Sequence, residues 1–119
     1  MKFLSSELKS EFELLLQRIK AGKMAVVVEG PKDKAALERL GISAADIITL
    51  NKNPLFEIAE EVAANYKSAA LLTDMDSEGK RLYGKMSSML QNLGVKIDDG
   101  LRNFLFRNTK IRQIEGLSF

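Results

Sequence analysis

The stretch that decides the fold is residues 69–80, AALLTDMDSEGK. It begins as an uninterrupted apolar run and ends in three acids, Asp74, Asp76 and Glu78, followed by Gly79. An apolar run followed at once by turn residues predicts a strand that is buried on both faces, as in a parallel sheet. Ligands of open α/β sheets bind outside the carboxyl ends of the strands. These acids are therefore expected where such folds carry out their chemistry.

The composition limits the chemistry that is open to the chain. Its 119 residues include no cysteine and no histidine, and the net charge is +2. Disulfides, thiolate nucleophiles and zinc–sulfur sites are therefore excluded, and a catalytic base must be a carboxylate, lysine, tyrosine or metal-bound water. A metal would be held by oxygen, which favours Mg²⁺ or Mn²⁺ over Zn²⁺. The small net charge says little about a nucleic-acid partner.

The apolar content of 45% and the charged content of 29% are typical of a soluble globular protein. No apolar run reaches the roughly 18 residues that a membrane span needs, and the N-terminus lacks a signal-peptide core. Together with the absence of cysteine, this predicts a cytoplasmic protein with no membrane partner. A chain of this length is expected to form one domain.

Strands and helices are predicted to alternate along the chain. Residues 3–21 carry apolar side chains at helical spacing, which predicts an amphipathic helix that packs on the sheet and ends at Gly22. Besides the strand that begins at Ala69, strands are predicted at residues 24–29, 47–50 and 95–98, the last with the alternating polarity of a sheet edge. Helices are predicted at residues 34–40, 54–66 and 78–93.

Several local features of these elements follow from single residues. Asp33 is expected to cap the helix that begins at Lys34, and Asn53 to cap the one that begins with Pro54. In the tail, Leu101, Phe104 and Leu105 suggest a short helix. A last strand is predicted at residues 111–117.

The regular alternation with short connections predicts an α/β fold of three layers, with a four-stranded parallel sheet and right-handed crossovers. If the strands that end at Glu29 and before Asp74 are neighbours, the strand order reverses between them, and Glu29 meets Asp74 and Asp76 in one crevice. Two unit charges about 4 Å apart repel by about 4 kcal/mol at an effective dielectric near 20. Such clustering therefore implies a cation or a shared proton.

These two strand ends carry a recognisable pair of motifs. Glu29-Gly30-x-x-Asp33, and 45 residues later Asp74-x-Asp76-x-Glu78-Gly79, resemble the toprim domain. That domain is shared by type IA and type II topoisomerases, bacterial-type primases, the ribonucleases that mature 5S ribosomal RNA and nucleases of the overcoming-lysogenization-defect type. The leading helix and short tail look more like the small stand-alone toprim proteins of prokaryotes, many of them archaeal, than like the large enzymes.

The resemblance covers residues 24–98 and implies a Rossmann-like toprim fold. Its expected organisation is a single toprim domain over residues 1–119, with an N-terminal helix (1–22), a toprim core (23–98) and a C-terminal extension (99–119).

The resemblance also implies Mg²⁺- or Mn²⁺-dependent phosphodiester chemistry on RNA or DNA, as a nuclease or a nucleotidyl or phosphoryl transferase. Glu29 matches the glutamate usually assigned general acid/base work and is also a candidate metal ligand. Asp74 and Asp76 match the aspartates that hold Mg²⁺, and Glu78 matches the third acid of the topoisomerase motif. In such sites one or two ions bridge the substrate phosphate oxygens and stabilise the attacking and leaving oxygens.

Two activities of the family are not expected of this chain. A type IA topoisomerase needs a tyrosine nucleophile on a separate domain, whereas Tyr66 and Tyr83 lie on predicted helices and are interpreted as packing residues. A primase needs a further basic domain and usually a zinc module. What remains is a small metal-dependent nuclease or phosphotransferase, or a toprim module that binds nucleic acid or a larger complex without catalysis.

The candidate residues also have plain structural interpretations. Asp76 or Ser77 would cap the following helix, whose dipole favours Glu78. Lys32 is either a phosphate contact beside Glu29 or a solvated loop lysine. The other basic candidates form either a nucleic-acid contact or ordinary solvated surface; they are Lys80, Arg81 and Lys85 on the helix after the acids, and Arg102, Arg107, Lys110 and Arg112 in the tail.

Two other families also cluster acids and Mg²⁺ on a doubly wound sheet. Phosphoacceptor domains of receiver type carry their acid pair after the first strand and a lone acceptor after the third. Haloacid-dehalogenase phosphatases carry paired aspartates after the first strand. Here the pair, Asp74 and Asp76, follows the third strand, which disfavours both families.

Overall fold

Four parallel strands form the central sheet in the order β2-β1-β3-β4. The computed structural model describes residues 5–117. Its strands are β1 (Ala25–Val28), β2 (Ile47–Thr49), β3 (Ser68–Leu71) and β4 (Lys96–Asp98). The predicted three-layer α/β fold with a four-stranded parallel sheet is confirmed, and β4 forms an edge of the sheet as its polarity indicated.

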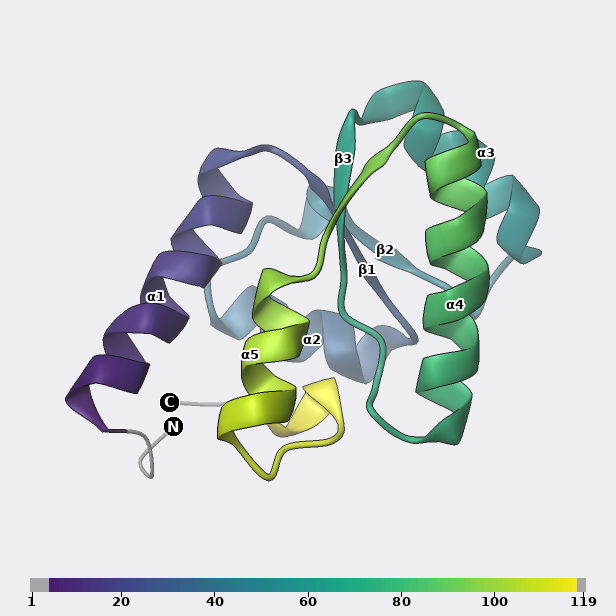
Figure 1. Cartoon of the computed structure of the whole chain (residues 1–119). Helices are drawn as coiled ribbons and strands as arrows, with labels where there is room; N and C mark the ends of the chain where they lie inside the picture. Colours follow the sequence, from purple (N-terminus) through teal and green to yellow (C-terminus); the bar gives the residue numbers. More distant parts are fainter. Residues whose placement is uncertain (1–4, 118–119) are drawn as a thin grey trace.

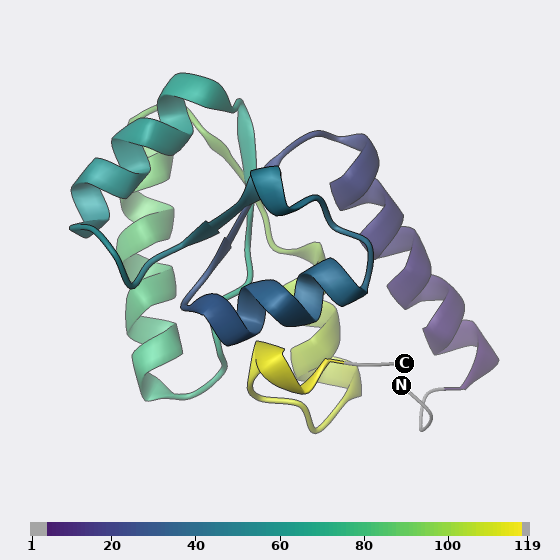
Figure 2. The ribbon, with the colours of Figure 1, turned by 180° about the vertical axis from the view of Figure 1, so that it is seen from behind.

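Helices cover both faces of this sheet (Figure 1). On one face lie α1 (Ser6–Ala21), α2 (Pro31–Arg39) and α5 (Gly100–Asn108), and on the other lie α3 (Leu55–Asn65) and α4 (Ser77–Asn92). Figure 2 shows the same layers from behind. None of the helices in the part of the chain described here is both long and apolar enough to cross a lipid bilayer.

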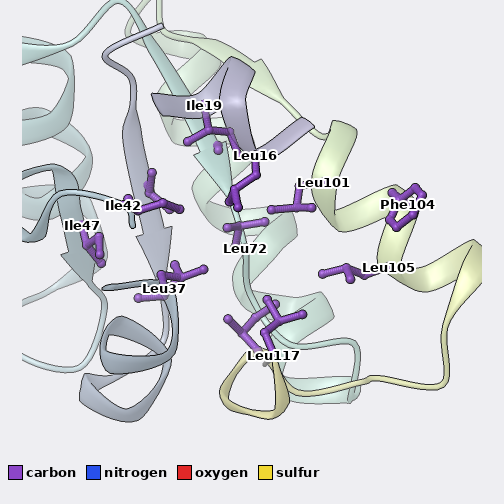
Figure 3. Packing of buried hydrophobic residues seen from close by; sticks show 14 of the residues in the cluster. Leu16, Ile19, Leu37, Ile42, Ile47, Leu72, Leu101, Phe104, Leu105 and Leu117 are labelled. Carbon is purple, nitrogen blue, oxygen red and sulfur yellow. The ribbon is translucent and has the colours of Figure 1, made fainter. Parts of the chain in front are cut away.

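The apolar runs in the sequence correspond to strands that are buried on both faces. Val26 and Val28 of β1 belong to the core under α1, α2 and α5, whereas Ala25 and Val27 belong to the core under α3 and α4. Successive residues of a strand point to opposite faces, so a strand between two helix layers has no position for a polar residue. Figure 3 shows the first of these cores, with Leu37 of α2 and Leu72 after β3 facing it.

The side of the sheet on which each helix lies follows from the strand order. The chain moves outward from β1 to β2 through α2, then back past β1 to β3 through α3, and on to β4 through α4. Crossovers of one hand must place their helices on opposite faces when the direction of travel reverses. The reversal lies between β1 and β3, and their carboxyl ends are neighbours there, which is the arrangement that the predicted crevice needs.

Two predicted helix caps are wrong by one to three residues. Helix α2 begins at Pro31, so Asp33 lies inside its first turn and accepts a hydrogen bond from the Gly30 N–H at 2.9 Å. Proline suits the first helical position because the N–H that it lacks would have no helical partner. Helix α3 begins at Leu55 after Pro54, and no side chain caps it.

The strand predicted at residues 111–117 is also wrong. This segment is irregular and ends in a 3₁₀ turn, η2 (Ile114–Gly116). Its apolar residues Ile111, Ile114 and Leu117 recur every third position, which is the period of a 3₁₀ turn and not of a strand. Ile114 and Leu117 are buried in the same core as Leu37 of α2. The N-terminal helix is as predicted where the structure describes it, while Leu4 lies outside the described residues.

The two sides of α1 provide a test of this packing. Phe12 is fully buried against Phe104 of α5, with 6.0 Å between ring centroids, whereas Leu14 on the same helix is 71% exposed. Phe12→Ala is expected to lower the free energy of unfolding by about 3–5 kcal/mol. Leu14→Ala is expected to change it by less than about 0.5 kcal/mol. Urea denaturation of both variants measures the difference, and equal effects would contradict the observed orientation of α1.

Candidate active site at the carboxyl ends of β1 and β3

Glu29 and Asp74, 45 residues apart in sequence, meet at the carboxyl end of the sheet. The Asp74 N–H donates a hydrogen bond of 2.7 Å to Oε2 of Glu29. Glu29 directly follows β1, and Asp74 lies three residues beyond the end of β3. Because the two strands are paired, their carboxyl ends lie side by side. The strand order therefore brings the two predicted strand-end acids together.

The C-terminal tail fixes the other side of Asp74. The Ile114 N–H donates to Oδ1 of Asp74 at 2.8 Å, and the Met75 N–H donates to the Arg112 carbonyl at 2.7 Å. Figure 1 shows the tail in yellow beside the loop between β3 and α4. These bonds occupy one oxygen of each of the two carboxylates, Oε2 of Glu29 and Oδ1 of Asp74.

Asp76 plays the structural part that its position predicted. It is the N-cap of α4, and its Oδ1 accepts a 2.7 Å hydrogen bond from the Gly79 N–H. Gly79 packs directly on the backbone of the acid-bearing loop, because a Cβ built at this position would overlap the carbonyl of Asp74. The fully buried Thr73 ties the same turn together by donating from Oγ1 to the Gly79 carbonyl at 2.9 Å.

Two further acids join this group, which we call the acidic cluster: Glu29, Asp33, Asp74, Asp76 and Glu115. Asp33 is buried in the first turn of α2, and Glu115 lies in η2 of the tail. Sequence reasoning missed Glu115 because the strand predicted at residues 111–117 gives no indication of a 3₁₀ turn beside Asp74. Asp33 was recognised as part of the motif, but its position on the helix was misassigned.

Burial and mutual repulsion perturb the ionisation of the cluster. Burial raises the pKa of Glu29, and the charges of Asp74, Asp76 and Asp33 raise it further, against the hydrogen bond from Asp74. Burial likewise raises the pKa of Asp74, with added repulsion from Asp33, Asp76 and Glu115, against the hydrogen bond from Ile114. The pKa of Asp33 is raised mainly by burial, and Glu115 adds repulsion to it. Negative charge is therefore concentrated here at a cost to the fold.

Glu78 does not join the cluster. Its exposed carboxylate accepts hydrogen bonds of 2.9 and 2.6 Å from Arg81 on the same turn of α4, and these bonds lower the pKa of Glu78. Lys32, on the first turn of α2, and Lys80, on the first turn of α4, are exposed near the two acid-bearing strand ends. Arg81 is exposed as well, but its guanidinium is paired with Glu78.

Arg102 of α5 was predicted only as part of a basic tail, and its position is more specific. Its Nε donates to the Thr73 carbonyl and its Nη2 to the Asp74 carbonyl, each at 3.0 Å. The guanidinium lies 4.5 Å from the centre of the Tyr83 ring. Burial, together with the hydrogen bond to Asp99, raises the pKa of Tyr83 to about 12. Tyr83 therefore stays protonated at neutral pH and is suited to packing and not to nucleophilic attack.

A cavity of about 680 Å³ lies at the other end of the sheet. Its lining includes Lys20, Lys23, Asp46 and Glu61, so its charges balance and favour neither an anion nor a cation. Tyr66, also in its wall, donates to Oδ1 of Asp46 at 2.9 Å and is thereby a structural residue, as predicted. The concentrated charge of this protein lies at the carboxyl ends of the strands and not in this cavity.

No three Asp or Glu side chains within residues 5–117 converge closely enough to form a metal-binding group as they stand. The donor set is nevertheless suited to a hard cation, since it consists of carboxylate oxygens alone. Mg²⁺ keeps several of its waters and is often bound through one or two carboxylates only. Glu29 and Asp74 are the two acids whose positions fit such binding best. One oxygen of each accepts a hydrogen bond from a backbone amide, which orients the carboxylate, and the two side chains meet at the boundary between β1 and β3.

Comparisons with known proteins place the chain among archaeal relatives. The UPF0292 protein of Pyrococcus abyssi is 36% identical over 106 residues, which cover 89% of this chain and 78% of that protein. The UPF0292 protein of Methanocaldococcus jannaschii is 35% identical over 114 residues, covering 89% of this chain and 88% of its own. The chain belongs to the UPF0292 family. No family model matches this UPF0292 sequence.

Solved structures share the fold of this UPF0292 protein. A protein from Aquifex aeolicus superimposes with a TM-score of 0.81 at 26% identity, covering 95% of this chain and all of that one. The zinc-binding and RNA polymerase domains of the Aquifex aeolicus primase superimpose with a TM-score of 0.52 at 20% identity, over 78% of this chain and 25% of the primase chain. At this identity the likeness to the primase concerns the fold alone.

The close contact at Gly79 of the UPF0292 chain predicts the effect of two matched substitutions in α4. Gly79→Ala would force Asp74 and the N-terminus of α4 apart, and overpacking of this kind costs about 1–3 kcal/mol. Gly84 lies in the same helix with open space around it, so Gly84→Ala is expected to stabilise by about 0.5–1 kcal/mol. Thermal denaturation distinguishes the two, and a stabilising Gly79→Ala would show that the loop does not press on the helix.

The raised pKa of Asp74 predicts that neutralising its carboxylate stabilises the fold by an amount that depends on pH. Because the pKa of Asp74 is raised in the folded state, the folded protein binds this proton more tightly than the unfolded chain, and stability falls as pH rises through the raised pKa. Asp74→Asn removes the charge while its side-chain oxygen still accepts from Ile114. With divalent ions chelated, the variant is expected to melt above wild type at pH 7, and the gap should narrow as pH falls toward about 4.

Melting curves recorded from pH 4 to 8 measure this gap. Lys32→Gln is a control that removes an exposed charge of the opposite sign near the same edge of the sheet. A melting temperature of Asp74→Asn below that of wild type at pH 7 would contradict the assignment of electrostatic strain to this carboxylate.

Proposed function

We propose that this chain is a toprim protein that carries out Mg²⁺- or Mn²⁺-dependent phosphodiester chemistry on nucleic acid. The observation that carries the proposal is the meeting of Glu29 and Asp74 at the point where the strand order reverses. Both carboxylates are held in surroundings that make their charge unfavourable. A bound cation would relieve that repulsion, which gives the arrangement a physical reason.

Asp74 and Glu29 would supply the first ligands of the ion. Asp76 is the third candidate, and it would have to share its carboxylate between the ion and the Gly79 amide. Waters would complete the coordination of Mg²⁺, as is usual where few carboxylates bind it. When bound, the ion supplies charge stabilisation to the attacking and leaving oxygens of a phosphodiester.

Glu29 is the group that we assign to proton transfer. Its raised pKa brings it closer to neutral pH, where a carboxylate exchanges a proton with a reacting oxygen most effectively. One oxygen is fixed by the Asp74 N–H, which orients the side chain. Without histidine or cysteine in the chain, the choice of proton carriers near this edge is narrow.

Exposed basic residues support a polyanionic substrate. Lys32 and Lys80 are exposed on the first turns of α2 and α4, the helices that follow the two acid-bearing strand ends. The phosphates of RNA or DNA would neutralise such charges with release of counterions. Arg81 has the weakest support among the predicted contacts, because its guanidinium is already paired with Glu78.

A binding module without catalysis is the second candidate function. It is favoured by the backbone bonds that engage Asp33, Asp74 and Asp76, since these also make the acids part of the local structure. In that case the acids and basic residues would hold nucleic acid, or a larger complex, without cleavage.

Cleavage assays on labelled single-stranded and duplex RNA and DNA, with Mg²⁺ or Mn²⁺, test the proposal. Turnover is expected in wild type. Glu29→Gln should lose at least about a hundredfold, because general acid–base catalysis typically contributes about 10²–10⁴-fold. Asp74→Asn should lose at least about tenfold, because it removes a charged oxygen ligand from the proposed ion. Glu78→Gln is the matched control and should retain activity, since Glu78 lies outside the acidic cluster. Unchanged turnover in both of the first two variants would end the catalytic proposal. Binding that survives Glu29→Gln, without turnover in wild type, would favour the binding module.

A further inference from the structure

The loop between β3 and α4 is held in place by one cationic side chain from outside the motif. The Nε and Nη2 atoms of Arg102 bind two consecutive main-chain carbonyls, those of Thr73 and Asp74, each at 3.0 Å. β3 ends at Leu71, so these carbonyls lie beyond the parallel sheet ladder. Thr73 is fully buried, and a buried carbonyl without a partner is costly. Arg102 thus supplies bonds that the sheet cannot.

Arg102 is itself held in a fixed orientation. Its guanidinium stacks on the Tyr83 ring of α4 at 4.5 Å, and the Tyr83 hydroxyl donates to Oδ1 of Asp99 at 2.5 Å, next to the start of α5. Arginine in this arrangement is not interchangeable with lysine, because only its planar fork reaches both carbonyls while it stacks on a ring. The contact therefore joins α4, α5 and the acid-bearing loop.

We propose that Arg102 is a positioning residue that clamps the loop carrying Asp74, so that Asp74 faces Glu29 and can share a divalent ion with it. The proposal rests on the metal site proposed above. It goes beyond it by assigning a role to a side chain of α5 that belongs to neither acidic motif. Arg102 acts through the backbone, since both of its bonds to the loop go to carbonyl oxygens and not to carboxylates.

Positioning and simple electrostatics predict opposite results for metal binding. If Arg102 acted only as a positive charge near the acids, its removal would strengthen the binding of a cation. If it positions Asp74, its removal weakens binding although the site becomes more negative. Loss of a group that orients a metal ligand typically costs about 10–100-fold in affinity.

The experiment measures Mn²⁺ binding by calorimetry for wild type, Arg102→Ala and Arg102→Lys. Affinity is expected to fall at least tenfold in Arg102→Ala, with partial recovery in Arg102→Lys, which keeps the charge but reaches only one carbonyl. Arg39→Ala is the charge-matched control on an exposed position of α2 and should bind Mn²⁺ as wild type does. Equal or tighter binding in Arg102→Ala would overturn the proposal.

Amide hydrogen exchange without metal separates this proposal from the metal site. Loss of the clamp is expected to speed the exchange of the Asp74, Met75 and Ile114 amides at least tenfold, while the amides of β1 keep their protection. If wild type binds no Mn²⁺, the metal site fails, and the exchange result alone decides whether Arg102 holds the loop. Unchanged exchange at these three amides would overturn the clamp. Arg102→Lys serves for this measurement if Arg102→Ala does not fold.

Discussion

The hydrogen bond from the Asp74 N–H to Glu29 links the ends of the two central strands, β1 and β3, where the strand order reverses. From β1 the chain turns to one side of the sheet, and from β3 it continues to the other. At that boundary, groups that follow the two strand ends interact with one another. The bond of 2.7 Å fixes two acids that would otherwise repel, and the rest of the acidic cluster is arranged around this pair.

The structure maintains this unfavourable pair from three directions. Arg102 holds the two carbonyls of the loop, and Gly79 allows the N-terminus of α4 to approach it. The tail donates from the Ile114 amide, while Ile114 and Leu117 are buried in the core beside α2. A carboxylate in such surroundings costs stability, and carboxylates with a perturbed pKa are found preferentially at functional sites. The C-terminal extension contributes directly to the surroundings of Asp74 through the Ile114 amide.

Sequence reasoning succeeded where short-range pattern and topology decide the structure. The apolar runs that end at Glu29 and before Asp74 predicted two strands of a parallel sheet correctly, because a strand covered by helices on both faces has no position for a polar residue. That these two strands are neighbours was only a condition of the predicted crevice, and the strand order of the structure meets it. Sequence reasoning failed where one local signal overrides another. Asp33 has the character of a cap, but Pro31 starts the helix earlier. A strand is predicted in the tail, although the apolar period of three residues there is that of a 3₁₀ turn.

The site shows the same division. The motif predicted Glu29, Asp74 and Asp76. The partners that set their geometry, Arg102 and the Ile114 amide, come from the C-terminal extension, where a short helix and basic residues were predicted but not these contacts. Glu78 matched the motif equally well. The structure places it on the exposed surface of α4, paired with Arg81, and the spacing of the motif does not predict this position. The positions of these acids could therefore be predicted from the sequence, whereas the groups that orient them could be identified only from the structure.

The central claim is that the acids at the ends of β1 and β3 form a site for a divalent cation. The most direct measurement is a crystal structure with Mn²⁺, in which anomalous scattering locates the ion independently of any activity. The account predicts a peak within coordination distance of carboxylate oxygens from both Glu29 and Asp74. A peak that contacts neither residue, or no peak at saturating Mn²⁺ in crystals with this edge of the sheet open to solvent, would contradict it.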